Sequence, residues 1–204
     1  MKRVIIFDFD GTIADSKRLH IDNIHHSLLE HSFLYTKSHI TKALGPKLEI
    51  TLKNLDKFSP ELMRKLKDNI NSNLAKKAKS LKLCHYAKET LEKIRKKGWK
   101  IILLTNSPRR FIVVFLKHNK IKKYFDKLFC AENFSSKESA IRQIAKAYRA
   151  KISDVIYVAD KLEDVKMAKN TGCRIIISLA CSWDRNKLKK SRFAVKSLRD
   201  IKLQ

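Results

Sequence analysis

The chain has 204 residues, and its 46 lysines and arginines against 20 aspartates and glutamates give a formal net charge of +26 at pH 7. Because 44% of the residues are hydrophobic, the chain is not a disordered basic tail, which lacks the apolar area needed to offset ordering entropy. The longest apolar run, residues 111–116, is far shorter than the ~20 residues of a membrane-spanning helix, so we expect no membrane association.

The first element in chain order is a short β-rich run over residues 3–7, which predicts a buried strand because it is too short for a helix. Residues 16–82 then show apolar residues at helical spacing, interrupted by Gly45-Pro46 and Ser59-Pro60. We expect an all-helical insertion of three or four helices here.

From residue 84 onward, helical and strand patterns alternate. This alternation predicts βαβ units and a parallel sheet with helices on both faces. We therefore predict an α/β fold: a Rossmann-like three-layer core formed by residues 1–15 and 83–204, and a small helical cap domain, residues 16–82, inserted after the first strand. The expected helices are 84–97, 108–118, 136–150, 162–171 and a weaker 184–190, and the expected strands are 100–105, 128–131, 154–159, 174–178 and 193–195.

The excess positive charge is spread along the chain. Residues 16–82 carry 14 basic and 6 acidic residues, and residues 83–204 carry 30 and 11. A solvated lysine-rich surface is the simplest interpretation. A nucleic-acid or polyphosphate partner, and a field that attracts small anionic substrates, are the two alternatives.

The N-terminal segment does not resemble a signal peptide, because only four apolar residues follow its basic start before the first aspartate. The chain has four cysteines, and they lack the paired spacing of a zinc site. We therefore expect a cytoplasmic protein with reduced, partly buried thiols at Cys84, Cys130, Cys173 and Cys181.

Carboxylates follow two of the predicted strands. Asp8 and Asp10 come after the first strand, and Asp160 and Asp164 come after a later one. Because ligands bind at the carboxyl ends of parallel strands, up to four carboxylates would share one pocket. Their mutual repulsion requires a cation, and a set of oxygen ligands suits Mg²⁺.

These segments resemble the motifs of the haloacid dehalogenase superfamily, in its phosphoglycolate-phosphatase-like branch with a helical cap. Residues 7–16 (FDFDGTIADS), 103–107 (LLTNS) and 157–164 (YVADKLED) are similar to the first, second and fourth motifs. Lys137 resembles the lysine of the third motif, and residues 45–52 resemble the substrate loop of the cap. The resemblance covers essentially the whole chain.

The resemblance implies phosphoryl transfer. Asp8 would be the nucleophile that forms an aspartyl-phosphate, and Asp10 would act as the acid and then the base. Mg²⁺ would be held by the Asp8 carboxylate, the main-chain carbonyl of Asp10, and Asp160, with Asp164 in or beside the shell.

The resemblance also implies a phosphate site. Thr105 and the backbone amide of Asn106 would bind phosphate oxygens, and Lys137 would neutralise the phosphoryl group. In the cap, His20 would lie near the acid/base aspartate and Lys47 would contact substrate. A hydrogen-bonded or exposed histidine and a solvated lysine are the alternatives.

A few residues depart from the family pattern or stay ambiguous. Ala159 stands where glycine is usual and Glu138 where proline is common, and neither change removes a catalytic group. Lys161 is an alternative to Lys137 as the phosphate-neutralising cation. We expect Ser107 to serve as a turn or helix cap and Trp183 to be a packing residue.

We therefore expect a Mg²⁺-dependent phosphatase that acts on a small phosphorylated metabolite, such as a phosphoglycolate-like phosphomonoester. Asp10 argues against dehalogenases and phosphonatases, whose leaving groups do not need this proton donor. The alternatives are a phosphosugar mutase or a pyrophosphatase of the same superfamily, or a nucleic-acid-binding protein or polynucleotide end phosphatase that would explain the charge.

Overall fold

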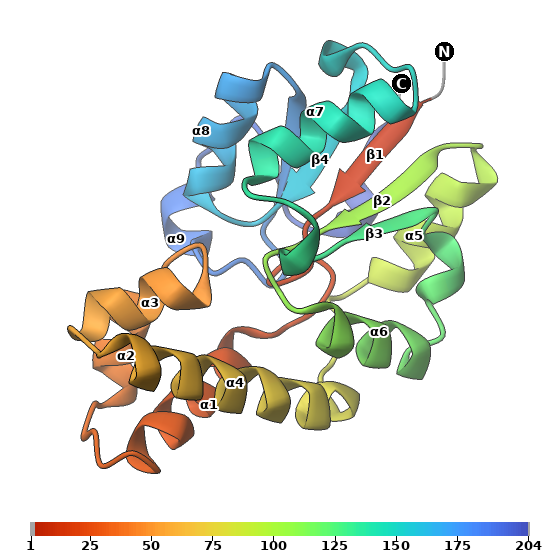
Figure 1. Cartoon of the computed structure of the whole chain (residues 1–204). Coiled ribbons are helices and arrows are strands. Elements are labelled where there is room, and N and C mark those ends of the chain that lie inside the picture. The colour runs from red at the N-terminus through yellow and green to blue at the C-terminus, as the bar shows by residue number, and fades with distance from the viewer. Residues whose placement is uncertain (1–2, 204) are drawn as a thin grey trace.

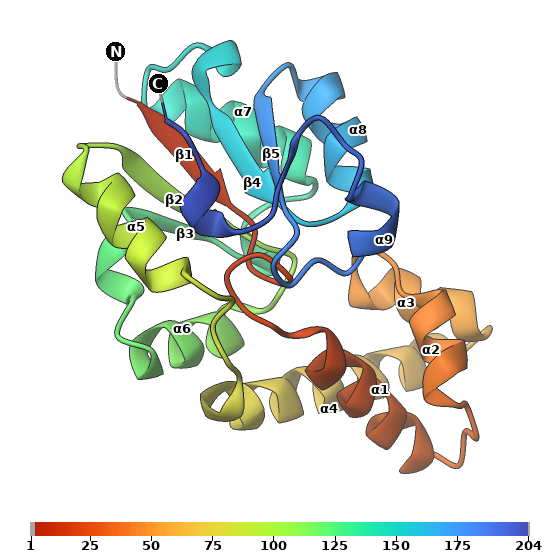
Figure 2. The same cartoon turned by 180° about the vertical axis from the view of Figure 1, so that it is seen from behind.

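The computed structural model describes residues 3–203 and contains, within them, a six-stranded parallel sheet in the order β3-β2-β1-β4-β5-β6 (Figures 1 and 2). This order places β1 and β4 side by side near the centre, so the aspartates that follow these two strands meet at one edge. The strands are β1 (Val4–Phe7), β2 (Lys100–Leu104), β3 (Lys127–Phe129), β4 (Ile156–Ala159), β5 (Arg174–Ser178) and β6 (Ala194–Val195).

Helices cover both faces of the sheet (Figure 1). Along β1, Val4 and Ile6 pack in one apolar cluster with α7, while Ile5 and Phe7 pack in the opposite cluster with α5 and α6. Since both faces are covered, the strand is apolar at every position rather than alternating. The predicted α/β/α fold is confirmed. The helices of this part are α5 (Ala87–Lys96), α6 (Arg109–His118), α7 (Lys137–Ala147), α8 (Leu162–Thr171) and α9 (Arg185–Leu188).

A helical insert, residues 17–77, lies beyond the carboxyl ends of the strands (Figure 1). Its last helix starts at Pro60, where the Ser59 hydroxyl accepts a hydrogen bond from the Leu62 amide at 3.3 Å. No helix within residues 3–203 has the length and apolar character needed to cross a membrane. The helices of the insert are α1 (Lys17–Leu29), α2 (Lys37–Ala43), α3 (Leu48–Leu55) and α4 (Pro60–Lys77).

The two chain segments that connect the insert to the sheet run side by side. Ala14 pairs with Leu83 in an antiparallel bridge, and the Asp15 amide donates to the Lys82 carbonyl at 3.0 Å. We call residues 13–15 and 82–84 the neck. Because the neck is paired, the insert is held directly over the carboxyl ends of β1 and β4.

Some element ends differ from the sequence prediction. The helix expected from residue 84 begins at Ala87, because Tyr86 adopts a left-handed conformation with φ 62° that cannot continue a helix. The helix expected to reach residue 150 ends at Ala147, two residues before Arg149 at φ 52°. Turn conformations of this kind leave no periodic signal in the sequence.

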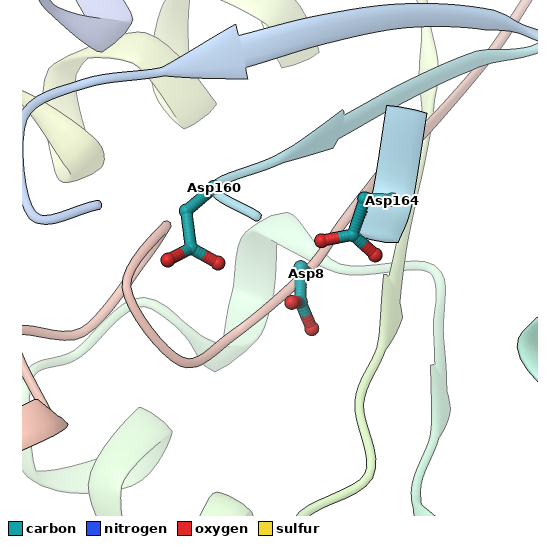
Figure 3. Close-up of side chains that lie close together, drawn as sticks. All are labelled: Asp8, Asp160 and Asp164. Atoms are coloured by element: carbon teal, nitrogen blue, oxygen red, sulfur yellow. The ribbon is translucent and has the colours of Figure 1, made fainter. Parts of the chain in front are cut away.

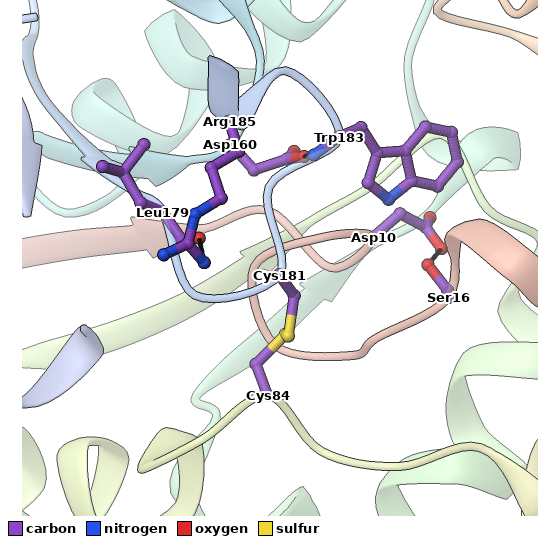
Figure 4. The surroundings of a disulfide bond; sticks show 8 residues. All are labelled: Asp10, Ser16, Cys84, Asp160, Leu179, Cys181, Trp183 and Arg185. Carbon is purple, nitrogen blue, oxygen red and sulfur yellow. Dashed lines mark hydrogen bonds between the residues drawn. A yellow bond between two sulfur atoms is a disulfide. The ribbon is translucent and has the colours of Figure 1, made fainter. Parts of the chain in front are cut away.

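The expectation of four reduced thiols is wrong for two of them. Cys84, in the neck, and Cys181, in the loop after β5, form a disulfide with a Cα–Cα distance of 5.9 Å (Figure 4). Cys130 and Cys173 remain free, and burial raises the pKa of both thiols to about 11. The paired cysteines are 97 residues apart, so only the tertiary fold brings them together.

The disulfide should make a large contribution to stability, because it closes a long loop. Loops of ~100 residues are worth up to ~4.7 kcal/mol in the chain-entropy model, and measured values are more often ~2–4 kcal/mol. We expect Cys181→Ser to lower Tm by roughly 5–15 °C in calorimetry, and reductant to lower the wild-type Tm similarly. Cys173→Ser is the matched control. A titration that finds four free thiols in the untreated protein would contradict the bridge.

Candidate active site

Three buried carboxylates meet where β1 and β4 end (Figure 3). Asp8 directly follows β1, Asp160 directly follows β4, and Asp164 lies in the first turn of α8. One oxygen from each lies within 4.8 Å of the others, and no residue of the three is more than 5% exposed. The structure therefore brings together three of the four carboxylates that the sequence pattern assigned to one pocket.

Burial and proximity make three negative charges costly here. Burial raises the pKa of Asp8 to about 6, even though the nearby charge of Lys137 lowers it. Burial also raises the pKa of Asp160 well above its usual value, and the Asp8 charge adds to the effect while Lys161 opposes it. The cluster therefore needs additional positive charge to stay fully ionised at neutral pH.

Lys137 supplies one positive charge. Its Nζ lies 3.0 Å from Asp8 Oδ2 and 3.3 Å from Asp164 Oδ1, and it donates to the Tyr157 hydroxyl at 2.7 Å. That hydroxyl in turn donates to Asp164 Oδ1 at 3.1 Å. Burial on its own lowers the pKa of Lys137, but the charges of Asp164 and Asp8 hold it above its usual value. The lysine is therefore a fixed cation against the predicted nucleophile.

The start of α7 explains how the lysine reaches this position. Ser136 caps the helix, since its hydroxyl accepts the Ser139 amide at 3.1 Å, and Lys137 is the first helical residue. Glu138, where the family commonly has proline, leaves this arrangement in place. Ala159, where glycine is usual, ends β4 without a positive φ, so the side chain is accommodated without backbone strain.

The orientation of Asp160 is set by the loop after β5. Its Oδ2 accepts a hydrogen bond from the Trp183 amide at 2.8 Å (Figure 4), while its Oδ1 is buried and has no partner among residues 3–203. Gly11, at φ +75°, permits this packing, because a Cβ there would lie 2.2 Å from Asp160 Oδ2. An unpartnered carboxylate oxygen beside two other carboxylates is a donor set that fits Mg²⁺.

Asp10 points into different surroundings. Its Oδ1 accepts from the Ser16 hydroxyl at 2.6 Å and lies 2.7 Å from His20 Nε2, and its Oδ2 accepts from the Ser107 hydroxyl at 2.6 Å. Burial alone raises the pKa of Asp10, but His20 and these hydrogen bonds lower it overall. Burial beside other carboxylates raises the pKa of Asp8, whereas His20 and the hydroxyl donors lower that of Asp10, so the two aspartates have opposite pKa shifts in the absence of a cation.

Strand alternation predicted that the side chains of Asp8 and Asp10 share one pocket, but Asp10 lies outside the three-carboxylate cluster. The local backbone explains this separation. The chain leaves the strand at Phe9, whose carbonyl accepts hydrogen bonds from the amides of Thr12, Ile13 and Ala14 at 2.9–3.3 Å. This tight turn directs the Asp10 side chain toward the insert and away from the three-carboxylate cluster.

The predicted phosphate-site residues lie at the same edge. The Thr105 hydroxyl accepts the Ser107 amide at 3.0 Å and is 3.5 Å from Asp10 Oδ2. The Asn106 side chain donates to the Pro46 carbonyl of the insert at 2.8 Å.

Lys47, predicted to contact substrate, donates to the carbonyl of Ser135 at 2.8 Å. The side chains of Asn106 and Lys47 therefore tie the insert to the sheet-bearing part of the chain.

Four residues at the site were missed or given another role. Ser107 does not cap α6, because Pro108 occupies the capping position and the serine hydroxyl bonds to Asp10. Trp183 orients Asp160 rather than serving only as packing, and Tyr157 and Ser16 bond to the site from a strand and a helix start. For Ser107 the available signal was its place in the loop that follows β2.

A cavity of about 80 Å³ lies between Asp10 and the insert. Its walls combine apolar side chains of the insert with polar groups from the insert and from the sheet-bearing part of the chain. Its lining residues include Asp10, His20, Leu44, Leu48, Thr51, Ile70, Asn71, Leu74, Asn106, Lys161 and Trp183.

The carboxylate cluster lies at the strand ends of a parallel α/β sheet, where ligands bind in open sheets of this kind, with a helical insert above it. Residues 5–178 match the model of the haloacid dehalogenase-like hydrolase family, and the chain belongs to this family.

Relatives and solved structures agree with this assignment. The chain is 24% identical over 187 residues to the pyrophosphatase PpaX of Bacillus mycoides (88% of this chain, 83% of that protein). It is 27% identical over 184 residues to a phosphoglycolate phosphatase of Vibrio parahaemolyticus (84% and 81%). A predicted phosphoglycolate phosphatase from Haemophilus somnus has the same fold, with a TM-score of 0.85 at 15% identity over 98% of this chain and 96% of that one.

Asp8→Asn should stabilise the metal-free protein. The pKa of Asp8 is raised from 3.8 to about 6 in the folded chain, so its contribution to stability is most favourable at low pH and is lost as the pH rises through about 6. At pH 7 we expect the variant to melt roughly 2–8 °C above wild type without Mg²⁺. Asp154→Asn, an exposed position, is the control.

The same reasoning predicts that Mg²⁺ raises the wild-type Tm at pH 7, and that this effect shrinks below pH 6 as protons compete for the carboxylates. Thermal scans at several pH values, with Mg²⁺ and with EDTA, would measure both effects. A Mg²⁺ shift that is equally large in Asp8→Asn would contradict a role for Asp8 in holding the ion.

Proposed function

We propose that this hydrolase is a Mg²⁺-dependent phosphatase of small phosphorylated metabolites that works through an aspartyl-phosphate on Asp8. The observation that carries the proposal is the contrast between two neighbouring aspartates. Asp8 faces the carboxylate cluster and the Lys137 ammonium, and Asp10 faces hydroxyls, an imidazole and the cavity under the insert. One aspartate has the surroundings of a nucleophile, and the other has those of a proton-transfer group.

In the first step, an Asp8 oxygen attacks phosphorus and the bond to the leaving oxygen breaks. Lys137, at 3.0 Å from Asp8, orients the carboxylate and offsets charge on the phosphoryl oxygens. Asp10 lies toward the cavity, where a leaving group fits, and delivers a proton to the leaving oxygen. Since the environment of Asp10 lowers its pKa, the His20 imidazole at 2.7 Å is the adjacent group that can share this proton.

In the second step, Asp10 takes a proton from a water molecule that attacks the aspartyl-phosphate, and phosphate leaves. The hydrogen bonds from Ser16 and Ser107 keep the Asp10 carboxylate in one orientation for both steps. The insert, which Lys47 and Asn106 bond to the sheet-bearing part of the chain, would limit the access of bulk water to the cavity.

Asp8, Asp160 and Asp164, with the main-chain carbonyl of Asp10, are the groups that would hold Mg²⁺, which when bound neutralises the cluster and polarises a phosphoryl oxygen. The relatives support a phosphate-ester or phosphoanhydride substrate, since they are named phosphoglycolate phosphatase and pyrophosphatase. The cavity of about 80 Å³ favours a small leaving group in either case.

Loss of the nucleophile should abolish turnover. We expect Asp8→Asn to hydrolyse p-nitrophenyl phosphate at least about 1,000-fold more slowly than wild type. Without the Asp8 carboxylate no aspartyl-phosphate forms, so water has to attack the phosphate ester directly. EDTA should abolish the wild-type activity, and Mg²⁺ should restore it. Asp154→Asn controls for a charge change elsewhere on the chain. Activity that persists in Asp8→Asn, or in EDTA, would refute the assignment.

Loss of the proton-transfer group should separate the two steps. In Asp10→Asn, an aryl phosphate with a good leaving group still transfers its phosphoryl group to Asp8, but hydrolysis of the aspartyl-phosphate is slow because no base activates water. Acid-quenched protein should therefore carry one phosphoryl group, located by mass spectrometry in the peptide that contains Asp8. An unmodified peptide together with a normal steady-state rate would contradict the role of Asp10.

A further inference from the structure

Lys161 differs from the other lysine of the site in having no ionic partner. Its Nζ lies 4.0 Å from the centre of the Trp183 ring, and no carboxylate of residues 3–203 forms an ion pair with it. Lys137, in contrast, contacts both Asp8 and Asp164. The structure therefore holds one lysine in contact with the nucleophile and one open lysine on an aromatic platform, whose charge acts on Asp8 and Asp160 only from beyond ion-pair distance.

The open lysine faces the side of the leaving group. Lys161 lines the 80 Å³ cavity together with Asp10, and it is the only lysine or arginine among the described residues that does so. It also lines the two adjoining cavities between the insert and the rest of the chain, of about 250 and 360 Å³, and no other residue is common to all three. Lys161 therefore borders all three cavities.

The other residues that line the small cavity indicate which kind of group Lys161 would bind. Leu44, Leu48, Ile70 and Leu74 are apolar, and the other two titratable side chains, Asp10 and His20, are bonded to each other. A neutral alcohol leaving group needs no cation in such surroundings. An anionic one does, because its desolvation is costly unless an opposite charge receives it.

We infer that Lys161 determines specificity by binding a second anionic group, a carboxylate or a phosphate, on the leaving part of the substrate. The inference rests on the proposed function and narrows it to phosphate esters or anhydrides with a second negative charge a few bonds from the scissile one. The cavity volume is far below the ~300–1,000 Å³ of sites for drug-sized ligands, so this leaving group is small.

The test compares substrates that differ only in that charge. Phosphoglycolate and ethylene glycol monophosphate have similar size, but the second has a hydroxymethyl group in place of the carboxylate, and pyrophosphate supplies the phosphate version. In Lys161→Gln, we expect the ratio of kcat/KM between either anionic substrate and the neutral one to fall about tenfold to a hundredfold. Lys161→Arg should recover most of this ratio, and Lys169→Gln, on the exposed side of α8, is the matched control.

The pattern of loss decides the outcome. A fall in the kcat/KM ratio for phosphoglycolate alone, or for pyrophosphate alone, supports the inference and identifies the group as a carboxylate or a phosphate. An equal fall for the anionic and neutral substrates would overturn it, because Lys161 would then act on the transferred phosphoryl group. An unchanged ratio would also overturn it.

A binding measurement keeps the inference separate from the proposed function. In the Asp8→Asn background with Mg²⁺, calorimetry gives the affinities for phosphoglycolate and for ethyl phosphate without any turnover. We expect Lys161→Gln to weaken phosphoglycolate about tenfold or more relative to ethyl phosphate. Equal weakening of both would refute the inference even if the phosphatase activity stands. If wild type hydrolyses no phosphate ester, the proposed function fails while this selectivity can still be measured.

Discussion

The repulsion among three buried carboxylates is the constraint on which this structure depends. Parallel pairing of β1 with β4, with Phe7 opposite Val158, brings Asp8 and Asp160 to the same edge of the sheet, and the first turn of α8 adds Asp164. Folding therefore places like charges together in a region of low dielectric, where an uncompensated charge is expensive. The surrounding residues are arranged to offset that cost. Lys137 is held at the start of α7, and the Tyr157 hydroxyl bridges it to Asp164.

The loop after β5 connects this cluster to the helical insert. The Trp183 amide and the Ser182 hydroxyl bond to the side chain and the main chain of Asp160, and the Trp183 carbonyl accepts the Lys17 ammonium at 3.1 Å. Lys17 is the first residue of α1. The Cys84–Cys181 disulfide joins the same loop to the neck (Figure 4). The neck and the first helix of the insert are therefore connected to a carboxylate of the cluster by a short covalent and hydrogen-bonded path.

Sequence reasoning predicted the elements whose patterns are local. Strands covered on both faces read as continuous apolar runs, and helices of the insert show their buried stripe, so their order and approximate ends follow from the sequence. Asp8, Asp10, Asp160 and Asp164 were predicted to converge because they follow two strands of one parallel sheet, and all but Asp10 form the cluster. The direction of Asp10 could not be predicted, because it depends on hydrogen bonds to the Phe9 carbonyl. The Cys84–Cys181 pair depends on two loops meeting in space, which no spacing rule encodes.

The distribution of charge around the site bears on the high net charge of the chain. At the boundary between the insert and the sheet, Lys17, Lys42, Lys161 and Lys187 line one cavity against only Glu163 and Asp184, and the next is lined by Lys47, Lys137, Lys161 and Lys166 against Glu138, Glu163 and Asp164. Low-dielectric walls focus the field of such a group and raise the local concentration of small anions. Attraction of small anionic substrates would account for this part of the charge without a polynucleotide partner. The same field also favours phosphate, the product, so weak and screened lysine contacts at the entrance serve turnover better than a tightly closed cationic site.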